Sequence, residues 1–426
     1  MNIYLYNIIG RKWGKILKKY FGTDGIRRIA NTELSPEFVY KVAKAGAYVL
    51  AKHSNHTPTI LIGRDTRISG TLIESAMTAG FLSYGANVKL LGVLPTPAVA
   101  YLTRKMNADA GVVISASHNT FEFNGIKFFS NKGMKISDEI EEEIEEIIDS
   151  GRIEELTAEH EKIGVSKAHP EYIYEYAGFI RDLFKDVKVT EDFVVGLDTA
   201  NGATFEVAKY IFEELGINYR IINNFPNGIN INRGCGSTHL EGLKDFVKQN
   251  KLSLGIAYDG DGDRCLAVDE EGNEIDGDIL LAIISKNLKE NNKLNKDTIV
   301  ATVMSNMGLK KYAKENHIAF VETKVGDRYV LEEMLKKGYN LGGEQSGHII
   351  LLDYNPTGDG ILTSLMLIQI MLEKQVKLSE LCKVIKKYPQ VLINVRVNDD
   401  KKKNYETEEL VESFIYDSET GDEAKN

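Results

Sequence analysis

Ser117 stands at the end of an apolar run, in the sequence Val-Val-Ile-Ser-Ala-Ser-His-Asn of residues 112–119. Polar neighbours, among them His118, Asn124 and Lys127, surround it with hydrogen-bond donors. A serine in this setting can cap a following helix, act as an alcohol nucleophile, or carry a phosphoryl group. The last interpretation requires cations nearby, because a phosphoserine carries about −1.5 to −2 charges. The Gly-x-Ser-x-Gly turn that a Ser-His hydrolase prefers is missing around Ser117.

Asp259, Asp261 and Asp263 alternate with two glycines and form a cluster of carboxylates. The glycines let the chain curl, so the carboxylates can project to one side as hard oxygen ligands for Mg²⁺. Calcium is an alternative, since Glu270 falls at the twelfth position counted from Asp259, as in an EF-hand loop. The sixth position is Arg264, however, where the EF-hand turn needs glycine, and strand-like runs flank the segment. The pattern therefore favours Mg²⁺ over Ca²⁺ and over a merely acidic turn.

Glu344, Ser346 and His348 lie among glycines in residues 343–348, Gly-Glu-Gln-Ser-Gly-His. Because glycine lets a ligand come close to the backbone, these side chains can converge on one molecule. Glutamate and serine suit the hydroxyl groups of a sugar, or an amine. The alternative is a polar hairpin tip that binds nothing.

Arg27 ends the run Phe-Gly-Thr-Asp-Gly-Ile-Arg of residues 21–27 and is a candidate for binding an anion. Weaker candidates are Arg64, Arg67, Lys324 and Arg328. Each of these, taken alone, is more often a solvated or salt-bridged side chain.

The composition describes a globular α/β protein with several domains. A chain of 426 residues suggests about three domains at roughly 150 residues each. A net charge of −10 argues against nucleic acid as the main partner, since backbone binding needs a basic face. The three cysteines are far apart, so we expect no disulfide framework and a reducing, cytoplasmic compartment. No run reaches the roughly 18 apolar residues of a membrane span, so we expect no membrane partner.

Strand-like runs alternate with helical patterns, which favours parallel sheets with crossover helices. In each of three regions a polar loop follows an apolar strand, which makes internal duplication an attractive hypothesis. Ligands in open α/β sheets collect beyond the carboxyl ends of strands, where Ser117 is expected to lie. We expect strands over 59–63, 87–92, 111–115, 193–198, 254–258, 298–303 and 318–321, and helices over 35–52, 69–84 and from Asn201, with 137–150 as an acidic, solvated surface helix.

Taken together, the polar runs resemble the α-D-phosphohexomutase superfamily, and most closely its phosphoglucosamine mutase branch. The resemblance extends from about Tyr20 to Val397. Gln345 before Ser346 looks like the glucosamine enzymes, whereas loops of phosphomannomutases and phosphoglucomutases more often carry Met or Glu there. The runs that carry the resemblance are residues 21–27, 115–119 with 124–127, 230–232 with 235–239, 259–264 and 343–348.

The resemblance implies three similar α/β domains with mixed, mostly parallel sheets, plus an incomplete fourth α+β domain. The expected ranges are 20–171 for domain I with the phosphoserine loop, 172–275 for domain II with the Mg²⁺ loop, 276–386 for domain III with the sugar loop, and 387–426 for a truncated domain IV, after an unmatched extension over 1–19.

The resemblance also implies a mechanism in which phosphorylated Ser117 hands its phosphoryl group to O1 of glucosamine 6-phosphate and recovers one from O6. The product, glucosamine 1-phosphate, would feed UDP-N-acetylglucosamine synthesis. The cofactors would be one Mg²⁺ per subunit and a sugar 1,6-bisphosphate as activator and intermediate. The enzyme would be a monomer or a homodimer. The implied catalytic residues are Ser117, Lys127, Arg27 and His348, the metal ligands Ser117, Asp259, Asp261 and Asp263, and the substrate-binding residues His118, Arg264, Glu344, Ser346 and Lys324.

The sequence departs from the family at several places. Nothing after Pro389 matches the phosphate-clamping loop Arg-Pro-Ser-Gly-Thr-Glu-Pro of the fourth domain, so an inactive sugar-phosphate-binding remnant is one alternative. A phosphoglucomutase or phosphomannomutase of the same superfamily is another. Arg28 and Thr120 stand where the family usually has glycine and proline. A start at Leu17 would explain the unmatched extension.

Overall fold

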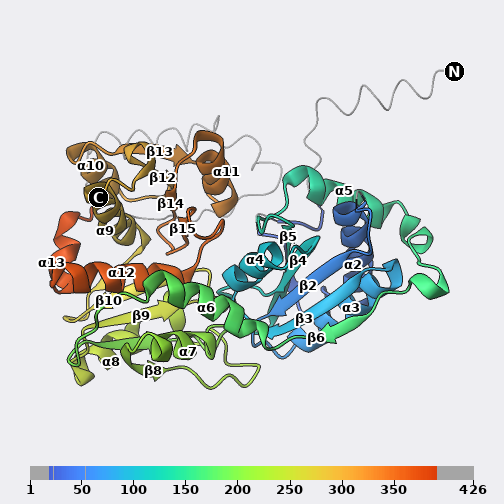
Figure 1. The fold of residues 1–426 in the computed structure, drawn as a ribbon, viewed down its shortest axis with the longest axis horizontal. Helices are drawn as coiled ribbons and strands as arrows, with labels where there is room; N and C mark the ends of the chain where they lie inside the picture. Colours follow the sequence, from blue (N-terminus) through green and yellow to red (C-terminus); the bar gives the residue numbers. More distant parts are fainter. Residues whose placement is uncertain (1–18, 23, 53, 391–426) are drawn as a thin grey trace, which may run out of the picture. The chain divides into compact units, whose positions relative to one another are not determined.

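Three mixed sheets, each with helices packed against it, make up the part of the chain that ends at Lys387 (Figure 1). The structure, a computed structural model, describes residues 19–22, 24–52 and 54–390. The expectations for residues 1–18 of the N-terminal extension and for most of domain IV lie outside the described residues. The α/β class with three mixed sheets is confirmed, whereas the domain limits stay a prediction.

The first sheet has the order β1-β5-β4-β2-β3-β6. Strands β2, β3, β4 and β6 pair in parallel, while β5 runs antiparallel to both β4 and β1. The strands are β1 (Ile26–Ile29), β2 (Thr59–Arg64), β3 (Asn87–Val93), β4 (Ala110–Ile114), β5 (Phe123–Ser130) and β6 (Ser166–Ala168), and the helices are α2 (Pro36–Ala51), α3 (Gly70–Tyr84), α4 (Thr96–Lys105) and α5 (Asp138–Asp149).

Both faces of this sheet are covered, which explains why β4 reads as a continuous apolar run rather than an alternating one. Val112 and Ile114 point into a core that α2, α3 and α5 close. Val113 points to the other face, where it packs in a core that includes Val99 of α4. All five residues of β4 are buried. The strand therefore holds the start of the Ser117 loop rigidly from two sides.

The second sheet has the order β11-β10-β9-β7-β8 and the third the order β13-β12-β14-β15. The second contains β7 (Val194–Asp198), β8 (Asn218–Ile222), β9 (Leu254–Tyr258), β10 (Cys265–Asp269) and β11 (Glu274–Ile275), with α6 (Tyr172–Phe184), α7 (Val207–Glu214) and α8 (Glu241–Asn250). The third contains β12 (Thr298–Thr302), β13 (Ala319–Thr323), β14 (Leu341–Gly343) and β15 (Ile349–Leu351), with α9 (Gly277–Glu290), α10 (Met307–Glu315), α11 (Asp327–Lys337), α12 (Gly360–Lys374) and α13 (Leu378–Leu381).

One connection recurs in all three sheets. A strand with a parallel neighbour turns into an antiparallel strand, as β4 into β5, β9 into β10 and β14 into β15. These three turns contain Ser117, the aspartates and residues 343–348, the predicted sugar loop, so each polar loop follows a strand as expected. The alternative of a serine that caps a following helix is wrong, because the Ser117 loop leads into β5.

Two of the expected helices have ends that follow from their local residues. Helix α2 begins after Ser35, whose Oγ accepts a hydrogen bond from the Phe38 amide at 3.3 Å, with Pro36 in its first turn. Helix α3 ends at Gly85, which takes a φ of 100°. The helix expected from Asn201 begins only at Val207, because Ala200 and Asn201 adopt positive φ values of 53° and 49° that no helix allows.

Helix α5 is not the simple solvated helix that its glutamates suggested. Glu141 and Glu145 are only 2% and 7% exposed. The Glu145 carboxylate accepts hydrogen bonds from the backbone amides of Lys19, Tyr20 and Phe21 at 2.7–2.9 Å. Glu141 accepts one from Arg328 at 2.6 Å. Helical spacing predicted the helix correctly, but partners that lie more than 120 residues away decide which glutamates are buried.

Among the helices of the described residues, none has both the length and the apolar character that crossing a bilayer requires.

Candidate functional site

The turn of the first sheet and the turn of the second meet at Ser117. Its Oγ donates a hydrogen bond to Oδ2 of Asp259 at 2.6 Å, and both residues are 1% exposed. Gly260 allows this approach, since a Cβ there would lie 2.5 Å from the Ser117 carbonyl oxygen. The serine and the carboxylates, which come from separate runs of the sequence, therefore form one site.

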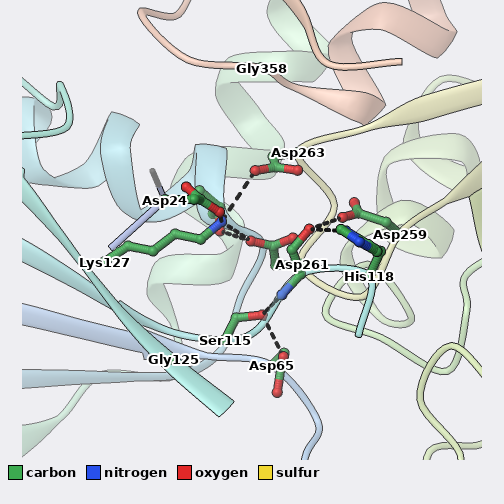
Figure 2. A network of polar contacts seen from close by, with 12 residues as sticks. Asp24, Asp65, Ser115, His118, Gly125, Lys127, Asp259, Asp261, Asp263 and Gly358 are labelled. Atoms are coloured by element: carbon green, nitrogen blue, oxygen red, sulfur yellow. Dashed lines mark hydrogen bonds and ion pairs between the residues drawn. The ribbon is translucent and has the colours of Figure 1, made fainter. Parts of the chain in front are cut away.

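The Ser117 loop is held in a strained conformation by a buried hydrogen-bond chain. Ser117 has a φ of 51°, which is unfavourable for a residue with a side chain and clusters at functional sites. Its amide donates to Oγ of Ser115 at 2.9 Å, and Ser115 Oγ donates to Asp65 at 2.5 Å (Figure 2). Asp65 in turn pairs with Arg67 at 2.8 Å.

Arg67 holds the Ser117 loop in place and is therefore not free to bind a substrate anion. Its side chain is fully buried, and it donates to the carbonyl oxygens of Ser117 and Asn119 at 2.9 and 2.8 Å. Asn232, which follows β8, donates to the same two carbonyls at 2.8 and 2.9 Å. The salt-bridged interpretation of Arg67 is therefore the correct one.

The three aspartates form the cluster that a divalent cation would need. Asp259, Asp261 and Asp263 are 1%, 0% and 3% exposed, and their ligand atoms lie within 4.8 Å of one another. Oδ2 of Asp261 is held by Thr96 Oγ1 at 2.7 Å and by Lys127 at 2.8 Å. The Oδ1 atoms of Asp261 and Asp263 are buried and have no hydrogen-bond partner among the described residues. Because such atoms are costly to leave unpaired, the cluster fits a bound cation.

The electrostatics of the cluster agree with this fit. Burial, together with the charges of Asp261 and Asp263, raises the pKa of Asp259 well above its usual range. Burial also opposes ionisation of Asp263, but Lys127 and His348 outweigh it and lower the pKa of Asp263. Asp259 is thus the carboxylate whose ionisation the other two oppose, and a bound metal ion would remove this repulsion.

The EF-hand alternative fails at its twelfth position. The Glu270 carboxylate accepts hydrogen bonds from Ser379, at 2.6 Å from the hydroxyl and 3.3 Å from the amide. It is not a member of the aspartate cluster, so the loop lacks the bidentate glutamate of a calcium site.

Lys127 extends from β5 to the aspartates, as Figure 2 shows. Its Nζ lies 2.8 Å from Asp261, 3.4 Å from Asp263 and 3.0 Å from Asp24. Burial alone would lower the pKa of this lysine, but the three carboxylates raise it well above its usual range. Lys127 therefore supplies a positively charged side chain at the site, as a phosphoserine would require.

Arg27 and Asp24 form the edge of the site on the side of β1. The Arg27 guanidinium donates to Asp24 at 2.9 Å and to the Asn119 side chain at 3.3 Å. Asp24 also pairs with Lys127 and Lys135, and these cations overcome burial and lower its pKa well below the usual range. Asp24 was not predicted as a site residue, although it lies within the run that ends in Arg27.

His118 lies beside Asp259 (Figure 2), and its Nδ1 is 3.5 Å from Ser117 Oγ. Burial and the nearby cations Arg264 and Arg27 lower its pKa to about 4. The imidazole is therefore neutral at pH 7, so that one ring nitrogen donates a hydrogen bond and the other accepts one.

A pH dependence of stability follows from His118. Because its folded pKa of about 4 lies below the ordinary 6.5, the unfolded chain binds more protons between these values, and stability falls as the pH is lowered through them. Both proteins are compared without Mg²⁺ and without phosphate on Ser117. We expect the melting temperature to fall less between pH 7 and pH 4.5 for His118→Asn than for the wild type. Equal losses in the two proteins would contradict the buried, neutral state of His118.

His348 is 3% exposed and lies between two carboxylates. Nδ1 is 3.7 Å from Asp263, Nε2 is 3.3 Å from Asp327, and Nε2 accepts the Gly358 amide at 3.0 Å. Burial lowers the pKa of His348, but Asp327 and Asp263 outweigh it, so that the pKa is raised. Protonation of Nε2 would exchange the Gly358 hydrogen bond for an ion pair with Asp327.

The sugar loop lies in the β14–β15 turn as a hairpin tip with its own anchors. Oε1 of Glu344 accepts the Gly326 amide at 3.1 Å, and Ser346 Oγ is buried without a hydrogen-bond partner among the described residues. Gln345 donates to Asp276 at 3.3 Å, so the residue that resembles glucosamine enzymes is held by the start of α9. Lys324 is exposed and lies two residues from Gly326.

Arg264 lies within electrostatic range of both the aspartate cluster and Glu344. Burial lowers its pKa, but Asp259, Asp263 and Glu344 outweigh this and raise it. Its Nε is buried and has no hydrogen-bond partner among the described residues. An unpaired guanidinium nitrogen beside carboxylates of both loops suits a bound anion.

Several residues that hold the site were not predicted: Asp24, Asp65, Thr96, Lys135 and Asp327. Asp24 and Asp65 stand within runs that were singled out for their arginines, so their proximity in sequence was a usable signal. Thr96, Lys135 and Asp327 reach the site only through the fold, and no sequence spacing indicates them.

Three family matches cover most of the described chain. Residues 18–155 match the family described as phosphoglucomutase/phosphomannomutase, alpha/beta/alpha domain I, residues 171–272 match domain II and residues 276–388 match domain III.

Curated relatives are similar over almost the whole chain. The phosphoglucosamine mutase of Ruminiclostridium cellulolyticum is 51% identical over 404 residues, which cover 94% of this chain and 89% of that protein. That of Acetivibrio thermocellus is 53% identical over 396 residues, 92% of this chain and 87% of that protein.

Solved structures share the fold at lower identity. A phosphoglucomutase/phosphomannomutase family protein from Burkholderia thailandensis has a TM-score of 0.71 and 23% identity, with 87% of this chain and 80% of that chain covered. The phosphoglucomutase parafusin from Paramecium has a TM-score of 0.71 and 21% identity, with 85% and 73% covered. At these identities the likeness establishes the fold alone.

Proposed function

Because the chain belongs to the phosphoglucosamine mutase family of the α-D-phosphohexomutase superfamily, and so acts on a hexosamine phosphate, we propose that Ser117 is its phosphoryl carrier. The observation that carries this proposal is the 2.6 Å hydrogen bond from Ser117 Oγ to Asp259. It brings a strained, buried hydroxyl to a carboxylate cluster with two unpaired oxygens, which is the environment that phosphoryl transfer requires.

In the proposed cycle, phosphorylated Ser117 meets glucosamine 6-phosphate. The bond from serine Oγ to phosphorus breaks and a bond from phosphorus to the sugar O1 forms. The resulting 1,6-bisphosphate turns within the site and returns its O6 phosphoryl group to Ser117, which leaves glucosamine 1-phosphate. Each transfer moves one proton from the attacking hydroxyl to the departing oxygen.

The residues around Ser117 are suited to hold the charge that moves. Asp259, Asp261, Asp263 and an oxygen of the phosphorylated serine would hold one Mg²⁺, which when bound neutralises charge on the transferring phosphoryl group. Arg27, Lys127 and Arg264 would orient the phosphoryl oxygens. Lys127 and His348 are the candidates for acid–base work because both lie beside Asp263, at 3.4 and 3.7 Å. The carboxylates that raise the pKa of Lys127 favour its protonated form, which suits the role of a proton donor.

Glu344 and Ser346 are proposed to hold the sugar, with Lys324 and His118 at the substrate's phosphate groups. The buried, unpaired Ser346 Oγ needs a partner, and a sugar hydroxyl would supply it. The proposal includes a sugar 1,6-bisphosphate activator, a cytoplasmic location and a monomeric or homodimeric enzyme. A phosphoglucomutase or phosphomannomutase activity is the alternative that the same transfer site could serve.

Glu344→Gln separates these alternatives. Loss of the carboxylate removes a charge-assisted hydrogen bond to the amine of glucosamine, which is worth about 1.5–3 kcal/mol, or about 10- to 150-fold in affinity. We expect kcat/KM for glucosamine 6-phosphate to fall by that factor and kcat/KM for glucose 6-phosphate to change much less.

The measurement is steady-state turnover of both sugars, with Mg²⁺ and bisphosphate present, for the wild type and the variant. An equal loss for the two sugars would contradict amine recognition by Glu344. A wild type that prefers glucose or mannose 6-phosphate would favour the alternative activity.

A further inference from the structure

The turn at the start of α11 contacts residues from loops of the first and the third sheet. Oδ2 of Asp327 lies 2.5 Å from Nζ of Lys135, which follows β5, and 3.3 Å from Nε2 of His348. The preceding amide, that of Gly326, donates to Glu344 in the sugar loop at 3.1 Å. A displacement of this turn would therefore move the residues proposed to hold the sugar.

Lys135 links this turn to residues beside Ser117. It forms an ion pair with Asp24, whose carboxylate also pairs with Arg27 at 2.9 Å and Lys127 at 3.0 Å. The side chains of Lys135 and Asp327 are only 9% and 13% exposed. One lysine thus stands between a carboxylate beside Ser117's loop and a carboxylate beside the sugar loop.

We propose that Lys135 and Asp327 are positioning residues that set the separation of the sugar loop from Ser117 and thereby retain the sugar bisphosphate between the two transfers. This inference rests on the proposed function. Neither residue needs to touch the substrate, since Asp24 and His348 lie between the pair and the reacting groups.

Retention of the bisphosphate is the step at which such a pair matters most. The intermediate must turn without leaving, because its loss leaves Ser117 unphosphorylated until an activator bisphosphate binds. A misplacement of about 1 Å between reacting groups can cost about 100-fold in rate. A looser sugar loop would therefore slow transfer and increase the need for added bisphosphate.

The same turn offers a matched control. Arg328 pairs with Glu141 of α5 at 2.6 Å, and the two side chains are 9% and 2% exposed. This bridge also fastens α11 to the first α/β unit, but its contacts lead to α5 and not to Asp24 or His348. Loss of the Arg328 bridge should destabilise the protein without changing the bisphosphate requirement.

The experiment uses the full chain with Mg²⁺ and measures kcat, the melting temperature and the concentration of glucosamine 1,6-bisphosphate that gives half-maximal activity. The variants are Lys135→Met, Asp327→Asn, Lys135→Arg and Arg328→Gln. We expect the first two to raise the activator concentration at least about tenfold, and Lys135→Arg to keep it within about threefold. Arg328→Gln should lower the melting temperature and leave the activator concentration unchanged.

Two results would overturn the inference while leaving the proposed function intact. One is that Lys135→Met and Asp327→Asn need the same bisphosphate concentration for half-maximal activity as the wild type. The other is an equal rise in Arg328→Gln, which would reduce the pair to a general role in stability. A wild-type protein that does not convert glucosamine 6-phosphate would instead refute the proposed function, and the inference with it.

Discussion

The Ser117→Ala protein is expected to fold and to bind Mg²⁺, but to convert glucosamine 6-phosphate at least about 10⁴-fold more slowly than the wild type, as loss of a covalent nucleophile does elsewhere. The physical reason is that the proposed phosphoryl carrier is lost, and the Thr96 hydroxyl, which also contacts the aspartate cluster, already donates to Asp261 at 2.7 Å. Ser115, the nearest serine in sequence, already donates to Asp65 at 2.5 Å. The assay is conversion to glucosamine 1-phosphate with Mg²⁺ and catalytic bisphosphate.

Ser115→Ala is the matched control for this prediction. It removes a hydroxyl two residues away that accepts the Ser117 amide and positions the loop, but that takes no part in transfer. We expect a partial loss of about 10- to 100-fold, the scale of one misplaced hydrogen bond in an active site. Mass spectrometry should find phosphate on the wild type and on Ser115→Ala, and none in Ser117→Ala. Activity of Ser117→Ala near that of Ser115→Ala would contradict the carrier role.

Removal of the divalent cation should abolish turnover and lower the stability of the protein. EDTA leaves the buried carboxylates facing one another, and the raised pKa of Asp259 shows where the repulsion falls. Because Mg²⁺ binds only the folded cluster, it should raise the melting temperature of the wild type in proportion to the logarithm of its concentration. At 100 times the dissociation constant the added stability is about 2.7 kcal/mol.

Asp259→Asn should have opposite effects on the two forms of the protein. Without metal it relieves the repulsion, so the melting temperature should equal or exceed that of the wild type. With Mg²⁺ it should show little further stabilisation and about 100-fold or greater loss of metal affinity and activity. Glu270→Gln is the control, since its partner is Ser379, and its response to Mg²⁺ should be that of the wild type. Equal stabilisation of Asp259→Asn and wild type by Mg²⁺ would contradict the site.

The parts of the site that could be predicted from the sequence are those that one short run encodes. Asp259, Asp261 and Asp263 belong to one turn, and glycines at fixed offsets reveal the curl that brings them together. The recurring strand-to-loop pattern predicted that Ser117 and Glu344 would lie at strand ends, which the three turns confirm.

What could not be predicted is the partner of each charged side chain. Arg67 was a weak candidate for anion binding, and only the fold shows that its guanidinium donates to carbonyl oxygens of the Ser117 loop. Asp24 meets Lys135, 111 residues away, and Thr96 meets Asp261, 165 residues away. Such pairs depend on how sheets are packed together, whereas periodicity reports only which face of a single element is apolar.

Transfer of a labelled phosphoryl group tests the central claim most directly. The enzyme, labelled with ³²P on Ser117 and freed of excess donor, is mixed with unlabelled glucosamine 6-phosphate and Mg²⁺, and the products of the first turnover are separated. The proposed cycle predicts that the label leaves Ser117 and appears on O1 of glucosamine 1-phosphate, while Ser117 carries unlabelled phosphate from O6. Product that forms while the label stays on Ser117, or label released as inorganic phosphate, would contradict it.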